Sequence, residues 1–135
     1  MAKEVRTRAV SRELYKNYLR KAEEFYRSME QAYHASDWNA CVANAIHCAI
    51  SSADAMTVFY LGFRHAGEKH QDVLQLLQEI DFDLKEIQSK NRQLSSLLSI
   101  KNRAEYEERL MGKSDAGNAL KAAKRFHEWV KDKLG

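Results

Sequence analysis

Proline is absent from this 135-residue chain, and cysteine occurs only twice. Because proline breaks helix interiors and fixes turns, its absence is typical of a chain made mostly of long helices. Two cysteines do not make a disulfide framework, and buried free thiols in a reducing compartment are the simpler interpretation. We therefore expect a cytoplasmic protein without disulfide bonds.

Long apolar runs are also lacking. No run approaches the roughly 20 residues that span a bilayer, and no signal-peptide core follows the first residues. The net charge of +3 is far below that of a dedicated duplex binder. The length suits one domain. We expect no membrane association, a basic N-terminal arm over residues 1–10 and a single helical domain over residues 11–135.

Apolar residues recur every three or four positions along most of the chain, which is the period of an amphipathic helix. This spacing predicts helices over about residues 14–33, 38–63, 70–80, 84–106 and 116–134. The second segment is apolar around most of its circumference, so we expect it to be the central helix. No useful length alternates with period two, which predicts no strands. The expected fold class is all-α, an up-and-down four-helix bundle with an additional short helix.

Metal-binding patterns are scarce as well. Cys41 and Cys48 lack the CxxC or HxxxH spacing of structural zinc sites, and no Glu-x-x-His pair of a di-iron bundle occurs. We therefore expect no metal and no cofactor. A polar stripe crosses the central helix: Asn44, His47, Ser51 and Asp54. Solvent exposure and a polar cleft or dimer seam both remain open, because a buried polar group is costly unless it is paired.

Cationic residues gather at two predicted helix junctions. One junction carries Arg64, His65, Lys69 and His70, and the other carries Lys101, Arg103, Tyr106 and Arg109. Cations near one helix end and free amides at the next favour a bound anion, although ordinary helix capping uses the same residues. Arginine strengthens the case for phosphate, because a guanidinium can donate two parallel hydrogen bonds to it.

Three segments, in this order and spacing, resemble the HEPN domain family. They are Asn-Ala-Ile-His-Cys-Ala-Ile-Ser-Ser-Ala-Asp-Ala at 44–55, Lys-His-Gln-Asp-Val-Leu-Gln-Leu-Leu at 69–77 and Arg-Ala-Glu-Tyr at 103–106. The resemblance covers about Tyr15 to Lys133. It implies a helical bundle that usually forms a homodimer and is often encoded beside a small nucleotidyltransferase.

The resemblance also implies site residues. Arg103 matches the family arginine on the late helix, Tyr106 the tyrosine after it, His70 the histidine that opens the short helix and Asp54 the acidic position on the central helix. Many members of that family are RNases with an arginine and, after a short spacer, a histidine. No histidine follows Arg103 within reach. The spacing from Arg64 to His70 fits formally, but it spans a different junction.

Without that histidine, RNA cleavage by the usual route of the family loses its main proton carrier. Our main hypothesis is a non-catalytic HEPN-like homodimer that binds a nucleotide or a nucleic-acid phosphate, with a nucleotidyltransferase as partner. The expected ligand-binding residues are Arg103, Tyr106, Lys101, Arg64, His70 and Asp54. The alternatives are an RNase toxin of a toxin–antitoxin pair that uses His70, and a bundle that only binds another protein.

Overall fold

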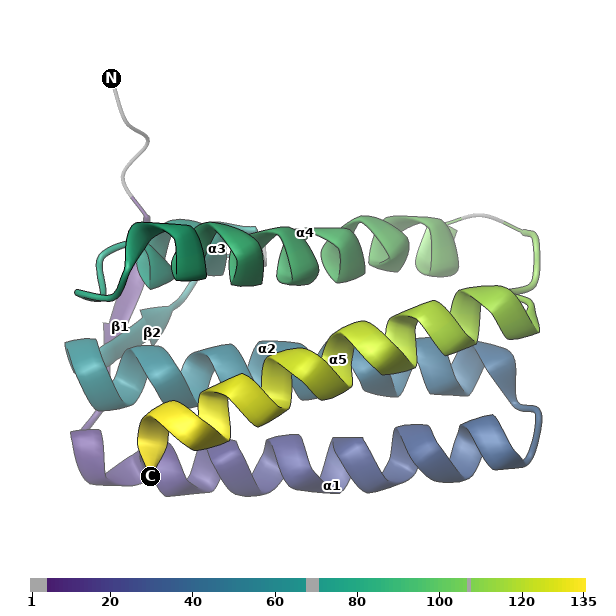
Figure 1. Ribbon diagram of the computed structural model, residues 1–135, viewed down its shortest axis with the longest axis horizontal. Helices are drawn as coiled ribbons and strands as arrows, with labels where there is room; N and C mark the ends of the chain where they lie inside the picture. The colour runs from purple at the N-terminus through teal and green to yellow at the C-terminus, as the bar shows by residue number, and fades with distance from the viewer. Residues whose placement is uncertain (1–4, 68–70, 107) are drawn as a thin grey trace.

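Four long helices lie side by side along the molecule in the computed structural model, which describes residues 5–67, 71–106 and 108–135 (Figure 1). They are α1 (Tyr15–His34), α2 (Trp38–Leu61), α4 (Leu84–Tyr106) and α5 (Lys113–Leu134). A short helix α3 (Asp72–Leu77) precedes α4, and a 3-10 turn η1 (Arg12–Leu14) precedes α1. The predicted all-α class is confirmed. None of the described helices combines the length and hydropathy of a membrane span.

Helix α2 is the centre of the core, as its all-round apolar sequence predicts. It packs against α1, α4 and α5, and most of its residues from Cys41 to Val58 are buried. Both cysteines are buried free thiols, which confirms their predicted state. Burial raises the pKa of Cys48 to about 12. Since the thiolate is the nucleophile, this sulfur is inert at neutral pH.

Carboxylates mark the starts of two of the long helices. The Asp83 Oδ1 atom accepts hydrogen bonds from the backbone N–H groups of Lys85 at 2.8 Å and Glu86 at 3.3 Å. Asp115 Oδ2 accepts one from Gly112 at 2.9 Å, so α5 begins at Lys113, earlier than its apolar period predicts. Asp37 is the N-cap residue of α2, and its side chain makes no capping hydrogen bond.

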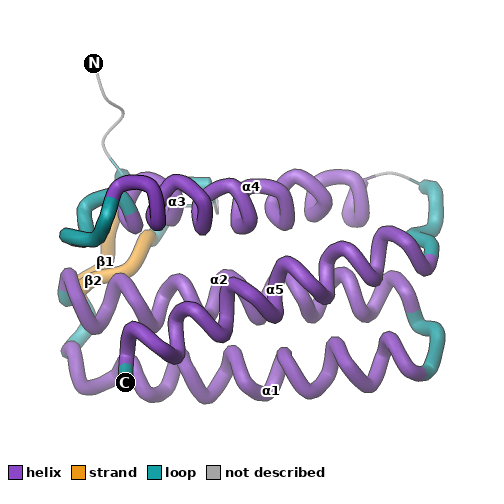
Figure 2. The backbone as a smooth tube through the Cα atoms, in the orientation of Figure 1, coloured by secondary structure: helices purple, strands orange, loops and turns teal. Residues whose placement is uncertain are grey.

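Two short strands correct the expectation of a strand-free chain. The strands β1 (Thr7–Ala9) and β2 (Phe63–His65) pair antiparallel at the end of the bundle where α2 finishes (Figure 2). Gly62 adopts a left-handed φ of 78° between α2 and β2, a conformation that glycine tolerates best. Three-residue strands are too short to show a period in the sequence. The second half of the predicted arm is therefore attached to the domain.

Candidate functional site

The residues predicted to bind phosphate lie at opposite ends of the bundle. Arg64 belongs to β2, at the end of the bundle where α4 starts, whereas Arg103 lies near the last residue of α4 (Figures 1 and 2). Helix α4 has 23 residues. At 1.5 Å per residue, its ends are about 35 Å apart. A single chain therefore does not bring Arg103 and Arg64 into one site.

At the far end of α4, Arg103 and Arg109 are exposed, and Lys101 is half-buried and already has an interaction partner. The side chain of Tyr106 and the whole of His70 lie outside the described residues. A role for these residues in phosphate binding stays a prediction.

The polar stripe of α2 is divided between solvent and interior. His47 is exposed and stacks on Phe25, with ring centroids 5.2 Å apart. Asp54 is only 7% exposed, and its Oδ1 atom lies 3.3 Å from Nδ1 of the buried His65. Because His65 belongs to β2, this pair fastens the strand to α2. The Asp54 carboxylate is engaged inside the fold, and its role in ligand binding stays a prediction.

Three arginines share the outer face of the two-stranded sheet. Arg8 and Arg64 are directly opposite each other in the register, so their side chains leave on the same face. Arg6 lies two positions before Arg8, and its carbonyl accepts a hydrogen bond from Ala66 at 2.8 Å, which continues the ladder. We call Arg6, Arg8 and Arg64 the arginine ribbon. None of the three forms an ion pair with another described residue.

The arginine ribbon is electrostatically unfavourable by itself. Like charges that face each other across a strand pair are destabilising. The Arg64 Nη1 atom donates a hydrogen bond to the carbonyl of His65 at 3.1 Å, which fixes the side chain. Its buried Nε atom has no hydrogen-bond partner in the part of the chain that is described. A bound anion would offset the repulsion.

A pocket with aromatic walls lies at the same end of the molecule. Its volume is about 340 Å³, and its lining residues are Arg12, Glu13, Tyr15, Phe59 and Tyr60. The rings of Tyr15 and Phe59 meet edge to face, with centroids 4.9 Å apart. The Tyr60 hydroxyl donates a hydrogen bond to the carbonyl of Lys133 at 2.9 Å, which fixes that wall.

Arg12 connects the aromatic pocket with the arginine ribbon. Its side chain lines the pocket and also covers Gly62, since a Cβ atom at Gly62 would lie 3.3 Å from Arg12 Nε. Gly62 leads directly into β2. Arg6, Arg8 and Arg12 were not among the site residues predicted from the sequence, where the basic character of the first ten residues was the only signal for Arg6 and Arg8. Cations and aromatic rings thus occur together at this end.

No group of three or more His, Cys, Asp or Glu residues suited to a metal ion occurs among the described residues. Arginines and aromatic rings gather at this end of the bundle, and such side chains bind phosphates and stack on planar groups.

The fold defines the class of protein as a helical bundle with a small accessory sheet. The model of the HEPN domain family matches residues 15–133, and the chain belongs to this family. The crystal structure of TT1696 from Thermus thermophilus superposes with a TM-score of 0.72 at 16% sequence identity. The match covers 89% of this chain and 98% of that chain, and at this identity it concerns the fold alone. No curated protein matches the chain.

Proposed function

We propose that this HEPN-family protein binds a nucleotide or single-stranded nucleic acid at the end of the bundle that carries the arginine ribbon. The ribbon would hold phosphate oxygens, and the aromatic pocket would receive a base. One observation carries the proposal: Arg12 lines the aromatic pocket and covers the glycine that leads into the ribbon. A nucleotide bound beside Arg12 would contact the ribbon through its phosphate and the aromatic pocket through its base.

General physical chemistry favours this ligand class. Guanidinium groups donate paired hydrogen bonds to phosphate, and they are over-represented where phosphate is recognised. Stacking of a base on an aromatic side chain contributes about 1–3 kcal/mol. A base inside a duplex is already stacked and paired, so the aromatic pocket favours single strands and free nucleotides over duplexes.

The first experiment measures binding of a labelled single-stranded RNA by fluorescence anisotropy over a range of salt concentrations. We expect Arg8→Ala and Arg64→Ala to weaken binding. Each should also reduce the slope of log K against log salt by about 0.7, since each removes one phosphate contact. We expect Phe59→Leu to weaken binding with no change of slope, because it removes a stacking surface and no charge.

Arg103→Ala is the matched control, since it removes the same charge at the opposite end of α4. Binding lost in Arg103→Ala and kept in Arg8→Ala and Arg64→Ala would move the site to the other end and contradict the proposal. The proposal is also contradicted if neither RNA nor free AMP binds the unchanged protein at low salt.

The same assay tests the rival function. Cleavage of the labelled RNA that disappears in His70→Ala would replace simple binding by RNase activity with His70 as proton carrier. The homodimer and the nucleotidyltransferase partner remain proposals based on the family. Light scattering on the purified chain checks the homodimer, and co-purification of the chain with a nucleotidyltransferase checks the partner.

A further inference from the structure

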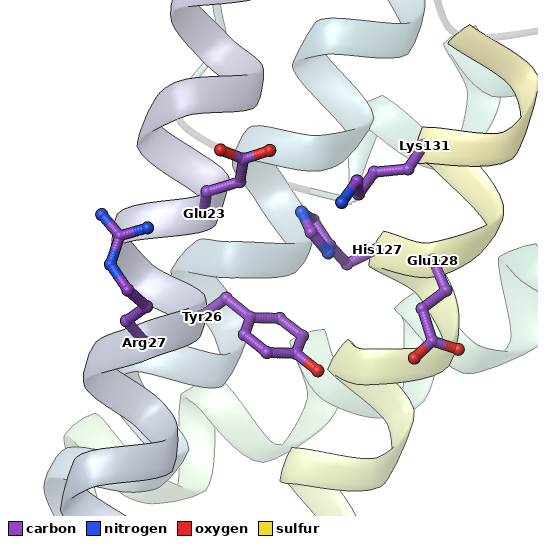
Figure 3. Close-up of a pocket in the computed structure, with 6 residues that line it drawn as sticks. All are labelled: Glu23, Tyr26, Arg27, His127, Glu128 and Lys131. Atoms are coloured by element: carbon purple, nitrogen blue, oxygen red, sulfur yellow. The ribbon is translucent and has the colours of Figure 1, made fainter. Parts of the chain in front are cut away.

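A second pocket lies between α1 and α5. Its volume is about 390 Å³, and its lining residues are Glu23, Tyr26 and Arg27 from α1 and His127, Glu128 and Lys131 from α5 (Figure 3). None of these residues belongs to the arginine ribbon or to the aromatic pocket. The pocket combines a buried histidine, a tyrosine and side chains of both charges.

His127 is the most unusual residue in this pocket. It is only 4% exposed, and its buried Nε2 atom has no hydrogen-bond partner among the described residues. The ring packs against Tyr26, with centroids 5.1 Å apart and planes tilted by 41°. A buried polar atom without a partner is destabilising. Such an atom in the wall of a pocket favours a polar ligand.

The four charged side chains of the pocket are not paired with one another. Glu23 and Arg27 are spaced for an ion pair along α1, as are Glu128 and Lys131 along α5, but neither pair is within 4.0 Å in the described structure. Figure 3 shows Glu23 and Lys131 extending from the two helices on either side of His127. The pocket thus presents a carboxylate from α1 and an ammonium group from α5 that are not paired with each other.

The protonation state of His127 decides whether the charges of the lining side chains cancel. Burial, and next to it the nearby Lys131, lower the pKa of His127, and the weaker influence of Glu23 and Glu128 is in the opposite direction. The ring is therefore neutral at neutral pH. Two cationic and two anionic side chains then surround an uncharged floor formed by His127 and Tyr26.

We propose that this pocket binds a small zwitterion with neighbouring ammonium and carboxylate groups, of which the α-amino acids are the simplest class. Lys131 would bind the carboxylate, Glu23 and the buried Nε2 atom of His127 would bind the ammonium group, and the Tyr26 ring would contact the carbon atoms between them. A plain anion would be repelled by Glu23 and Glu128. A plain cation would be repelled by Arg27 and Lys131, so a ligand with both charges fits best.

NMR spectroscopy of the histidine ring protons tests this proposal. The chain has five histidines, and His127→Gln assigns the signal of interest. The probes are glycine, alanine, glutamate, lysine and phenylalanine, compared with acetate, inorganic phosphate and methylammonium. We expect a saturable shift of the His127 signal with at least one amino acid and none with the singly charged probes. The exposed His47 on α2 is an internal control whose signal should not move.

Matched variants separate the pocket from general charge effects. We expect Lys131→Met and Glu23→Gln each to weaken amino-acid binding about tenfold, since each removes one charge-assisted hydrogen bond. Lys121→Met and Glu24→Gln make the same changes at exposed positions of the same two helices and should leave binding unchanged.

Two outcomes would overturn the proposal. One is a His127 signal that no amino acid shifts. The other is a response to acetate or phosphate as large as the response to the amino acids, which would make the pocket a simple anion site. RNA binding at the arginine ribbon is independent of both, because the two sites share no residue.

Discussion

His65 and His127 are equally buried, at 3% and 4% exposure, but their surroundings differ. The Nδ1 atom of His65 faces the Asp54 carboxylate at 3.3 Å, and the pair joins β2 to α2. The Nε2 atom of His127 has no hydrogen-bond partner in the described structure, and its ring borders a pocket. Burial alone therefore does not distinguish a histidine that faces a carboxylate from one that borders a pocket. The two histidines differ in the group beside the ring, since a carboxylate faces His65 and a pocket borders His127.

The largest expected effect follows from removing the partner of His65. Asp54→Ala should lower the free energy of unfolding by about 3 kcal/mol, because it removes one member of a buried pair. Asp115→Ala, at the start of α5, should cost only about 1 kcal/mol, the typical loss of one capping hydrogen bond. Urea denaturation of both variants measures the difference. Equal losses would mean that His65 does not depend on Asp54.

The next effect concerns the glycine that leads into the strand of His65. Gly62→Ala should destabilise the protein by about 1–2 kcal/mol, since its φ of 78° is left-handed and a Cβ atom would press against Arg12. Gly117→Ala inside α5 should instead stabilise it by about 0.5–1 kcal/mol, because the helix favours alanine. There a Cβ atom would make only an ordinary contact with the Tyr33 ring at 3.8 Å. Shifts of the same sign in the two melting temperatures would contradict this contrast.

The pH dependence of stability should distinguish His127. Burial lowers its pKa below the ordinary value of 6.5, so below pH 6.5 the unfolded chain binds this proton before the native protein does. Stability should therefore be complete above that pH and fall as the pH drops from 6.5 towards the lowered pKa of the native state. Unfolding measured at a series of pH values should show a shallower dependence in His127→Gln. An unchanged slope in the variant would mean that another group titrates.

The smallest expected effect is a gain in the stability of the fold. Arg8→Thr removes one of two arginines that face each other on the ribbon, and threonine suits a strand. The variant should be more stable by about 0.2–0.5 kcal/mol, the scale of such cross-strand pairs, while its affinity for RNA falls. Thermal unfolding and the anisotropy assay measure the two quantities. A loss of stability would show that Arg8 has a favourable partner within the fold.

The helices were largely predictable from the sequence because each long helix carries an apolar stripe that packs on the core. The prediction placed the start of α5 too late, since Lys113, Ser114 and Asp115 are polar and add nothing to that stripe. The strands were missed for a different reason. Their pairing joins residues that are separated by two whole helices, so the sequence of neither strand predicts it.

The candidate sites were predictable only in part. Arg64 was identified from its helix junction, but its strand neighbours Arg6 and Arg8 were assigned to an arm. Arg103 was grouped with Arg64 because both lie near helix ends, and the sequence does not say which ends meet. His127 was not a candidate, because it lies beside Phe126 and Val130 on the buried side of α5.

The strand pair also has a consequence for the order of folding. Strand β1 precedes α1 and β2 follows α2, so the pair closes a long loop that is entropically unfavourable to close by itself. Once α1 and α2 pack together, the two strands are already neighbours. The strand pair should therefore form after the helices have packed, and it should open before the helices separate. Native-state hydrogen exchange at the Val10 and Ala66 amides should report this opening while the core of α2 stays protected.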